Sequence, residues 1–163
     1  MLTEAVQSAL NGQIRAEFDS AYVYLSMAAH FDSVGLPGAS HWMRHQAKEE
    51  LEHGMKLYDY VLDRGGNVAL EAIDAPPSSF GSPLAVFEAA YEHERTITGS
   101  IHALHELAGR ERDLATQRRL QWFIDEQVEE EKSAAGLVAM MKRAGDDRAA
   151  QLVVDQHLAA RGD

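Results

Sequence analysis

Apolar residues recur along this chain at spacings of three and four, which is the period of an α-helix. The clearest series contains Leu120, Phe123, Gln127, Glu130, Ala134, Leu137 and Met141. Residues at these spacings share one helix face, the face that packs against the rest of the protein. No run of β-branched residues alternates with a period of two. The pattern therefore predicts an all-α fold without strands.

Four prolines and a few glycine clusters divide the 163 residues into segments. The segments predict helices at residues 3–32, 39–64, 83–109, 112–144 and 147–160. Ser82 and Pro83 supply the cap and the first helical residue that favour a helix start. Helices of about 27 residues are roughly 40 Å long. Four long helices and a short fifth predict a single domain, 1–163, built as a four-helix bundle with an added C-terminal helix.

The connections between these segments predict the threading of the bundle. Short turns join the first helix to the second and the third to the fourth, so each pair is expected to be antiparallel. Residues 67–82 include Pro76 and Pro77 and show no periodicity. Extended at about 3.3 Å per residue, this segment spans roughly 50 Å, enough to cross the bundle from end to end. We therefore expect two hairpins joined by one long crossover loop.

Several positions on the predicted inner faces are acidic where apolar residues are expected. They are Glu17, Glu50, Glu94 and Glu130. Four buried carboxylates repel one another, and each unpaired buried charge costs several kcal/mol. No lysine or arginine occupies an inner position, but two divalent cations would balance four negative charges, with His53 as a neutral ligand. Oxygen-rich ligation without thiolates favours iron or manganese over structural zinc.

The spacing of these residues is regular. Glu17 and Glu50 are 33 residues apart, and so are Glu94 and Gln127. Glu50 precedes His53 by three residues, as Gln127 precedes Glu130, so each of these pairs shares one helix face. A constant shift of 77 residues relates the two sets, as duplication of a helix hairpin would produce. We expect all these side chains to meet at one height in the bundle.

On these motifs the chain resembles the haem-free bacterial and archaeal ferritins over essentially its whole length. The resemblance implies one iron on Glu17, Glu50 and His53 and a second on Glu50, Glu94 and Glu130, with Glu50 bridging. Gln127 corresponds to the residue beside the bound dioxygen. Two aromatic residues, Tyr24 and Trp122, correspond to the family's extra electron source. A third, weaker iron site corresponds to Glu49, Glu126, Glu129 and Glu130.

Differences between this chain and related families narrow the choice of family. Bacterioferritins carry a second Glu-x-x-His where this chain has Gln127 and Glu130, and a haem-ligating methionine where this chain has Leu51. No haem is therefore expected. The chain has no cysteine, which excludes the Cys-x-x-Cys iron domain of the classical rubrerythrins. The mini-ferritins fit poorly because they lack the fifth helix at this end.

The resemblance implies a ferroxidase that stores iron. It would oxidise Fe(II) to Fe(III) with dioxygen or hydrogen peroxide and keep ferric oxy-hydroxide inside a shell of 24 copies. The fifth helix would supply a fourfold contact through Ala149, Leu152, Val153 and Leu158. Two other functions remain open: a di-iron oxidase or peroxidase without mineral storage, and a metal-free structural bundle.

Charge and composition limit the kinds of partner and the compartment that are expected for this chain. The net charge of −11 and the lack of a basic patch make nucleic acid an unexpected partner. No stretch approaches the roughly 18 apolar residues of a membrane span, and the start does not read as a signal peptide. With no cysteine, the chain is expected in the reducing cytoplasm.

Simpler readings compete at individual positions. The acidic residues Glu49, Glu126 and Glu129 could form a solvated face, Tyr24 could simply pack and hydrogen-bond a carboxylate, and Trp122 could serve packing alone. Two pairs of histidines have ligand spacing without carboxylates nearby, so we expect them to face solvent. They are His41 with His45 and His102 with His105.

Overall fold

The computed structural model describes residues 2–161, which form five helices and no strand. The helices are α1 (Glu4–Ser33), α2 (Pro37–Asp63), α3 (Pro83–Arg110), α4 (Leu114–Ala144) and α5 (Arg148–Leu158). The predicted all-α fold is confirmed. None of these helices is both long enough and apolar enough to cross a membrane.

Side-chain caps begin four of the helices. Thr3, Ser82, Asp113 and Asp147 each accept a backbone N–H of the first turn, which satisfies a donor that the helix itself leaves free. The fourth helix, predicted to start at about residue 112, begins at Leu114. Arg112 has a φ of 56°, in the left-handed region, so it belongs to the turn and Asp113 caps the helix instead.

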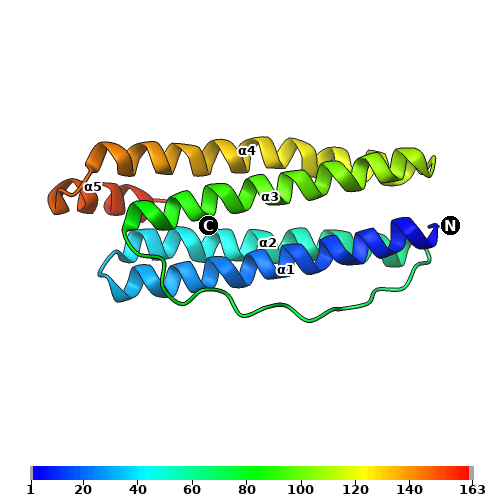
Figure 1. The fold of residues 1–163 in the computed structure, drawn as a ribbon, viewed down its shortest axis with the longest axis horizontal. Coiled ribbons are helices and arrows are strands. Elements are labelled where there is room, and N and C mark those ends of the chain that lie inside the picture. Colours follow the sequence, from blue (N-terminus) through cyan, green and yellow to red (C-terminus); the bar gives the residue numbers. More distant parts are fainter. Residues whose placement is uncertain (1, 162–163) are drawn as a thin grey trace.

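The helices form two antiparallel hairpins, α1 with α2 and α3 with α4 (Figure 1). The segment between α2 and α3 runs lengthwise along the outside of α1, as the predicted crossover requires (Figure 1). Side chains of α1 hold it there. The Asn11 side-chain amide donates to the carbonyl of residue 67 at 3.1 Å, Arg15 Nε to the carbonyl of residue 72 at 2.9 Å, and Ser26 Oγ to the carbonyl of residue 77 at 2.5 Å.

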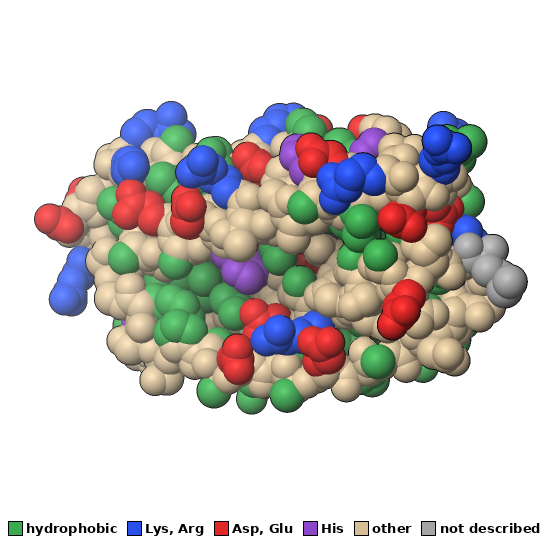
Figure 2. All heavy atoms as spheres, turned by 45° about the vertical axis from the view of Figure 1, so that its right-hand side comes forward, with side chains coloured by type: hydrophobic (Ala, Val, Ile, Leu, Met, Phe, Trp, Pro, Cys, Tyr) green, Lys and Arg blue, Asp and Glu red, His purple; other side chains and the backbone are tan. Residues whose placement is uncertain are grey.

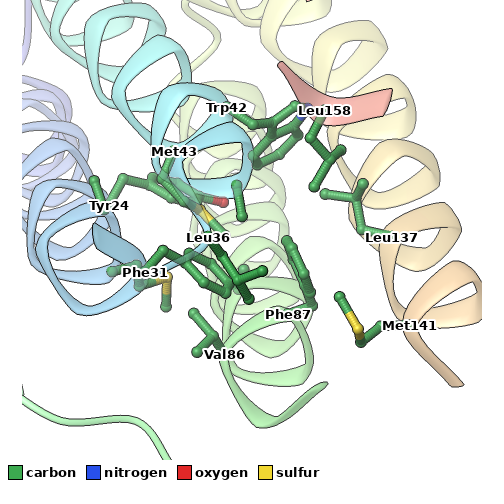
Figure 3. Packing of buried hydrophobic residues seen from close by; sticks show 14 of the residues in the cluster. Tyr24, Phe31, Leu36, Trp42, Met43, Val86, Phe87, Leu137, Met141 and Leu158 are labelled. Atoms are coloured by element: carbon green, nitrogen blue, oxygen red, sulfur yellow. The ribbon is translucent and has the colours of Figure 1, made fainter. Parts of the chain in front are cut away.

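The apolar core is divided into two clusters at opposite ends of the bundle. One is built around Val6, Leu10, Leu57, Ile101 and Leu120, and the other around Tyr24, Phe31, Met43, Phe87 and Met141. Figure 3 shows the second cluster, with residues from α1, α2, α3, α4 and the end of α5. On each long helix the residues between the two clusters include the predicted acidic positions. The bundle therefore has a polar middle layer.

Helix α5 packs against α2 and α4. The buried Asp155 accepts the backbone N–H of Ala39 at 2.7 Å and so caps the first turn of α2. Gly38 is required at this contact, because a Cβ there would lie 1.9 Å from the carbonyl oxygen of residue 155. The tight contact ties the C-terminal part of the chain to the start of α2.

Leu158, at the end of α5, points into the core beside Trp42 and Leu137 (Figure 3). The prediction that it contacts another copy of the chain is wrong, since only 3% of the residue is exposed. Leu152 and Val153, by contrast, are 50% and 65% exposed and remain free for such a contact.

Candidate metal centre

The middle layer gathers buried ligand groups from all four long helices. Glu17, Glu50, His53 and Glu94 are each no more than 4% exposed, and Glu130 is 7% exposed. They come from α1, α2, α3 and α4. The expectation that these positions meet at one height in the bundle is confirmed.

Two groups of ligand atoms share one residue. Glu17, Glu50 and His53 each offer an atom within 4.8 Å of the others, and so do Glu50, Glu94 and Glu130. The carboxylate of Glu50 has two oxygens, so it can serve both groups at once. His53 Nδ1 lies 3.4 Å from Glu50 Oε2, which places the imidazole beside the shared carboxylate. The geometry suits two cations bound side by side.

Electrostatics disfavour this layer in the absence of cations. Burial, followed by the negative charge of Glu50, raises the pKa of Glu17 well above its ordinary value. Burial and the charges of Glu94 and Glu130 raise the pKa of Glu50 in the same way. Burial, and then Glu94, raises the pKa of Glu130 from 4.5 to about 7. The shift at Glu130 alone corresponds to about 3 kcal/mol against the charged form.

Cations fit this donor set. Among residues 2–161, no lysine or arginine forms an ion pair with Glu17, Glu50, Glu94 or Glu130. Carboxylate oxygens with one imidazole nitrogen and no thiolate are ligands for iron or manganese. Two divalent cations would neutralise the four carboxylates and remove the repulsion that raises the pKa values of Glu17, Glu50 and Glu130.

Three glutamine amides hydrogen-bond these carboxylates. Gln127 Nε2 donates to Glu94 Oε2 at 3.1 Å, Gln13 Nε2 donates to Glu17 Oε1 at 2.9 Å, and Gln46 Nε2 donates to Glu130 Oε2 at 2.5 Å.

Sequence reasoning missed two of these glutamines, Gln13 and Gln46. Each lies four residues before an acidic ligand position, Glu17 or Glu50, and residues four apart share a helix face. This spacing of four residues is the feature of the sequence from which they could have been predicted. Gln46 also lies 3.4 Å from Glu50 Oε1, so it serves two ligand positions.

The two aromatic residues of the prediction lie next to the layer. Tyr24 is fully buried and donates its hydroxyl to Glu94, so the expected hydrogen bond to a carboxylate is present. Burial raises the pKa of Tyr24, which keeps the phenol protonated as a donor. Trp122 is 39% exposed, its ring centroid lies 5.3 Å from that of His53, and the Lys56 ammonium lies 4.2 Å from its ring. It therefore covers His53 rather than filling the core.

The residues of the expected third site are not all brought together. Glu126 has a ligand atom within 4.8 Å of His53 and Glu130. Glu129, on the exposed face of α4, is paired with Lys132 at 3.3 Å. Glu49 is paired with Arg161, and its charge also contributes to the raised pKa of Glu130. Only Glu126 is continuous with the central groups.

The two histidine pairs do not enter the groups of ligand atoms that the described residues form. His102 is exposed, as expected, and His105 is partly buried. His41 and His45 are also partly buried, and His41 Nε2 lies 3.0 Å from the carbonyl oxygen of residue 161. His41 also contacts His45, with ring centroids 4.8 Å apart.

The fold and the middle layer define the class of helical bundles that can hold two cations on shared carboxylates. A family model described as a ferritin-like domain matches residues 7–144. Bacterial non-heme ferritin of Bacteroides fragilis is 44% identical over 161 residues, covering 99% of this chain and 100% of the relative. That of Staphylococcus epidermidis is 40% identical, covering 99% and 97%. The chain belongs to the ferritin-like family.

Solved structures agree. An open pore ferritin from the hyperthermophilic archaeon Archaeoglobus fulgidus superposes with a TM-score of 0.98 at 51% identity, covering 99% of this chain and 100% of that one. A humanized archaeal ferritin also gives a TM-score of 0.98, at 50% identity over the full length of both chains. The resemblance drawn from the sequence motifs is thereby confirmed.

Proposed function

We propose that this chain is an iron-storing ferroxidase, with iron as its substrate and its cargo. The observation that carries the proposal is the position of Glu50, which belongs to both buried ligand groups. A shared carboxylate sets two Fe²⁺ ions close together, so that one oxidant molecule can collect an electron from each. Dioxygen or hydrogen peroxide is the oxidant.

Each residue of the layer has a role in this proposal. One Fe²⁺ binds Glu17, Glu50 and His53, and the other binds Glu50, Glu94 and Glu130. Gln127 lies beside Glu94 and faces the oxidant, and the Tyr24 hydroxyl orients Glu94 from the other side. Because three carboxyl groups have raised pKa values, metal binding displaces protons from the layer.

Storage requires assembly, and we propose a shell of 24 copies. Large apolar side chains are exposed at helical spacings on α1 and α2, among them Tyr22, Leu25, Leu51, Met55 and Leu62. Figure 2 shows hydrophobic patches between charged groups on one face of the molecule. Helix α5 adds Leu152 and Val153. Apolar surfaces of this kind support contacts between copies of the chain.

The proposal has three further parts. Residues 1–163 act as one ferritin-like domain with one di-iron centre. Glu49, Glu126 and Glu129 receive iron after the first oxidation, and Glu126 is the first of them to bind the iron that leaves the centre. The protein works in the cytoplasm, in agreement with the lack of cysteine.

An anaerobic Fe²⁺ titration followed by air tests this function. We expect fast oxidation of two irons per chain and then continued uptake of many more. Saturation at two irons would indicate an oxidase or peroxidase without storage, and absence of binding would indicate a structural bundle. The variant Glu52→Gln should behave like the wild type in this titration, because Glu52 lies between Glu50 and His53 in the sequence but on the exposed face of α2.

A further inference from the structure

The segment that follows α5 reaches back to the metal layer through one side chain. Arg161 Nη1 donates to Gln46 Oε1 at 3.0 Å, and its Nη2 lies 2.5 Å from Glu49 Oε2. The guanidinium carbon lies 4.7 Å from the centroid of the Trp42 ring, and the carbonyl of Arg161 meets His41 Nε2 at 3.0 Å. Four residues of α2 therefore fix this one arginine.

Arg161 determines which way the Gln46 amide points. A guanidinium has only donors, so it can hold the amide oxygen and never the amide nitrogen. Gln46 is fully buried, so its nitrogen must face the opposite direction. There it donates to Glu130 at 2.5 Å and approaches Glu50 at 3.4 Å.

The opposite orientation of the amide would harm the ligand group. With the oxygen turned inward, Gln46 would place a partial negative charge against Glu50 and Glu130 and would offer them no donor. With the nitrogen inward, Gln46 stabilises both carboxylates in the charged form that binds cations. The orientation of this amide therefore acts mainly on the second ligand group, through Glu130 and the shared Glu50, and Gln46 does not contact Glu17.

The first ligand group has the same arrangement with a different anchor. Ser100 Oγ donates to Gln13 Oε1 at 2.8 Å, and Gln13 donates to Glu17. Ser100 lies inside α3, whereas Arg161 lies beyond the last helix. The first group is thus anchored within the four-helix bundle, and the second depends on the docked C-terminal segment.

Resting on the proposed function, we propose that Arg161 is a positioning residue for the second metal ion. By orienting Gln46, it preorganises Glu50 and Glu130, and it couples docking of the segment after α5 to metal binding at Glu50, Glu94 and Glu130. Partners that orient metal ligands in this way typically contribute about 10- to 100-fold to metal affinity.

Co²⁺ is the probe, as a divalent first-row cation like Fe²⁺. The assembled protein is titrated anaerobically by calorimetry and by cobalt absorption, as wild type, Arg161→Gln and Arg44→Gln. We expect two ions per chain in the wild type. Arg161→Gln should weaken the second ion by on the order of tenfold and the first ion much less, because Glu130 belongs to the second group alone and only Glu50 is shared. Arg44→Gln is the matched control, because Arg44 pairs with Asp32 at 2.7 Å and does not touch Gln46.

Two further variants separate positioning from loss of structure. Arg161→Lys should restore part of the affinity, since one ammonium can donate to Gln46 without the fork that also reaches Glu49. In a Gln46→Met background, Arg161→Gln should have no further effect on the second ion, because the amide that it orients is gone.

Three results would overturn the inference: an unchanged second ion in Arg161→Gln, equal weakening of both ions, or the same loss in the Gln46→Met background. The last two would show that the arginine only holds α5 in place. A wild-type protein that binds no Co²⁺ in this layer would overturn the proposed function as well, so the two failures are distinguishable.

Discussion

Gln127 donates its side-chain amide to Glu94 at 3.1 Å across the second hairpin, 33 residues away in the sequence. The equivalent pair of the first hairpin, Glu17 and Glu50, is also 33 residues apart but brings two carboxylates into one ligand group. The two hairpins make the same cross-helix contact with different chemistry. The contact between Glu17 and Glu50 needs a cation to offset two negative charges. Glu94, by contrast, already accepts a hydrogen bond from the neutral amide of Gln127.

Replacing that neutral donor should destabilise the metal-free protein. In Gln127→Glu, a further carboxylate would face Glu94 in a buried site, and we expect a loss of about 1–3 kcal/mol at pH 8. The loss should shrink at pH 5, where the new carboxyl group would be protonated. Thermal unfolding at both pH values measures it. Gln121→Glu on the exposed face of α4 is the control, and an equal effect of both variants would contradict the argument.

Removing a ligand should abolish chemistry without unfolding the protein. In Glu50→Ala and His53→Ala we expect the helical circular dichroism to persist and the rate of iron oxidation to fall by more than about tenfold. Glu50 repels Glu94 and Glu130, so its loss relieves repulsion in the metal-free chain. Stopped-flow absorbance gives the rate. An unfolded variant, or one with the wild-type rate, would refute the assignment of these ligands.

The stability of the metal-free protein should depend on pH through Glu130. Its pKa is about 7 in the folded chain, against an ordinary 4.5, so the folded state holds a proton that the unfolded state releases. Stability from this group is present below pH 4.5 and is lost as the pH rises to about 7, by about 3 kcal/mol. The thermal midpoint with a chelator should therefore fall across this range.

The variant Glu130→Gln should reduce that fall, since it cannot titrate. Asp32 acts with the opposite sign: the hydrogen bond from Arg44 lowers its pKa, so its contribution is lost only below about pH 4. The two effects occupy separate pH ranges. Identical pH profiles for wild type and Glu130→Gln would show that Glu130 is not the titrating group.

The acidic residues outside the centre should act after the first oxidation. For Glu49→Ala, Glu126→Ala and Glu129→Ala combined, we expect a nearly normal rate for the first two irons and slower regeneration in later additions. Glu126→Ala alone should reproduce most of this change, because only Glu126 lies within ligand distance of His53 and Glu130. Oxygen consumed per iron is measured over repeated additions. Wild-type behaviour in every round would exclude the third site.

Assembly should depend on the exposed face of α5. We expect Leu152→Glu with Val153→Glu to weaken the complex, since two charges would enter an apolar contact between copies. Light scattering should give a mass on the order of half a megadalton for 24 copies of the 18.0 kDa wild-type chain. Leu114→Glu, 76% exposed at the other end of α4, is a comparison at a distant site. An unchanged mass in the α5 variant would rule out this contact.

The sequence by itself determined the class of fold and the principal acidic positions. Helical periodicity is a local property, so it could be read without knowing which helices meet. The series from Leu120 to Met141 is buried throughout, as predicted. Glu17, Glu50, Glu94 and Glu130 stood out because a charge on an apolar face is unfavourable unless something compensates it. The helical periodicity did not reveal the exact start of α4, because Arg112 takes a left-handed conformation in the turn before it.

Only the tertiary structure decided which neighbours support the centre. Gln46 and Arg161 are separated by 115 residues, and no periodicity connects them. Leu158 was predicted to face another copy because an amphipathic helix does not reveal what covers its apolar face, and the structure places it against Trp42 and Leu137. A hydrogen bond between distant residues depends on how the helices pack, and packing is a property of the whole chain.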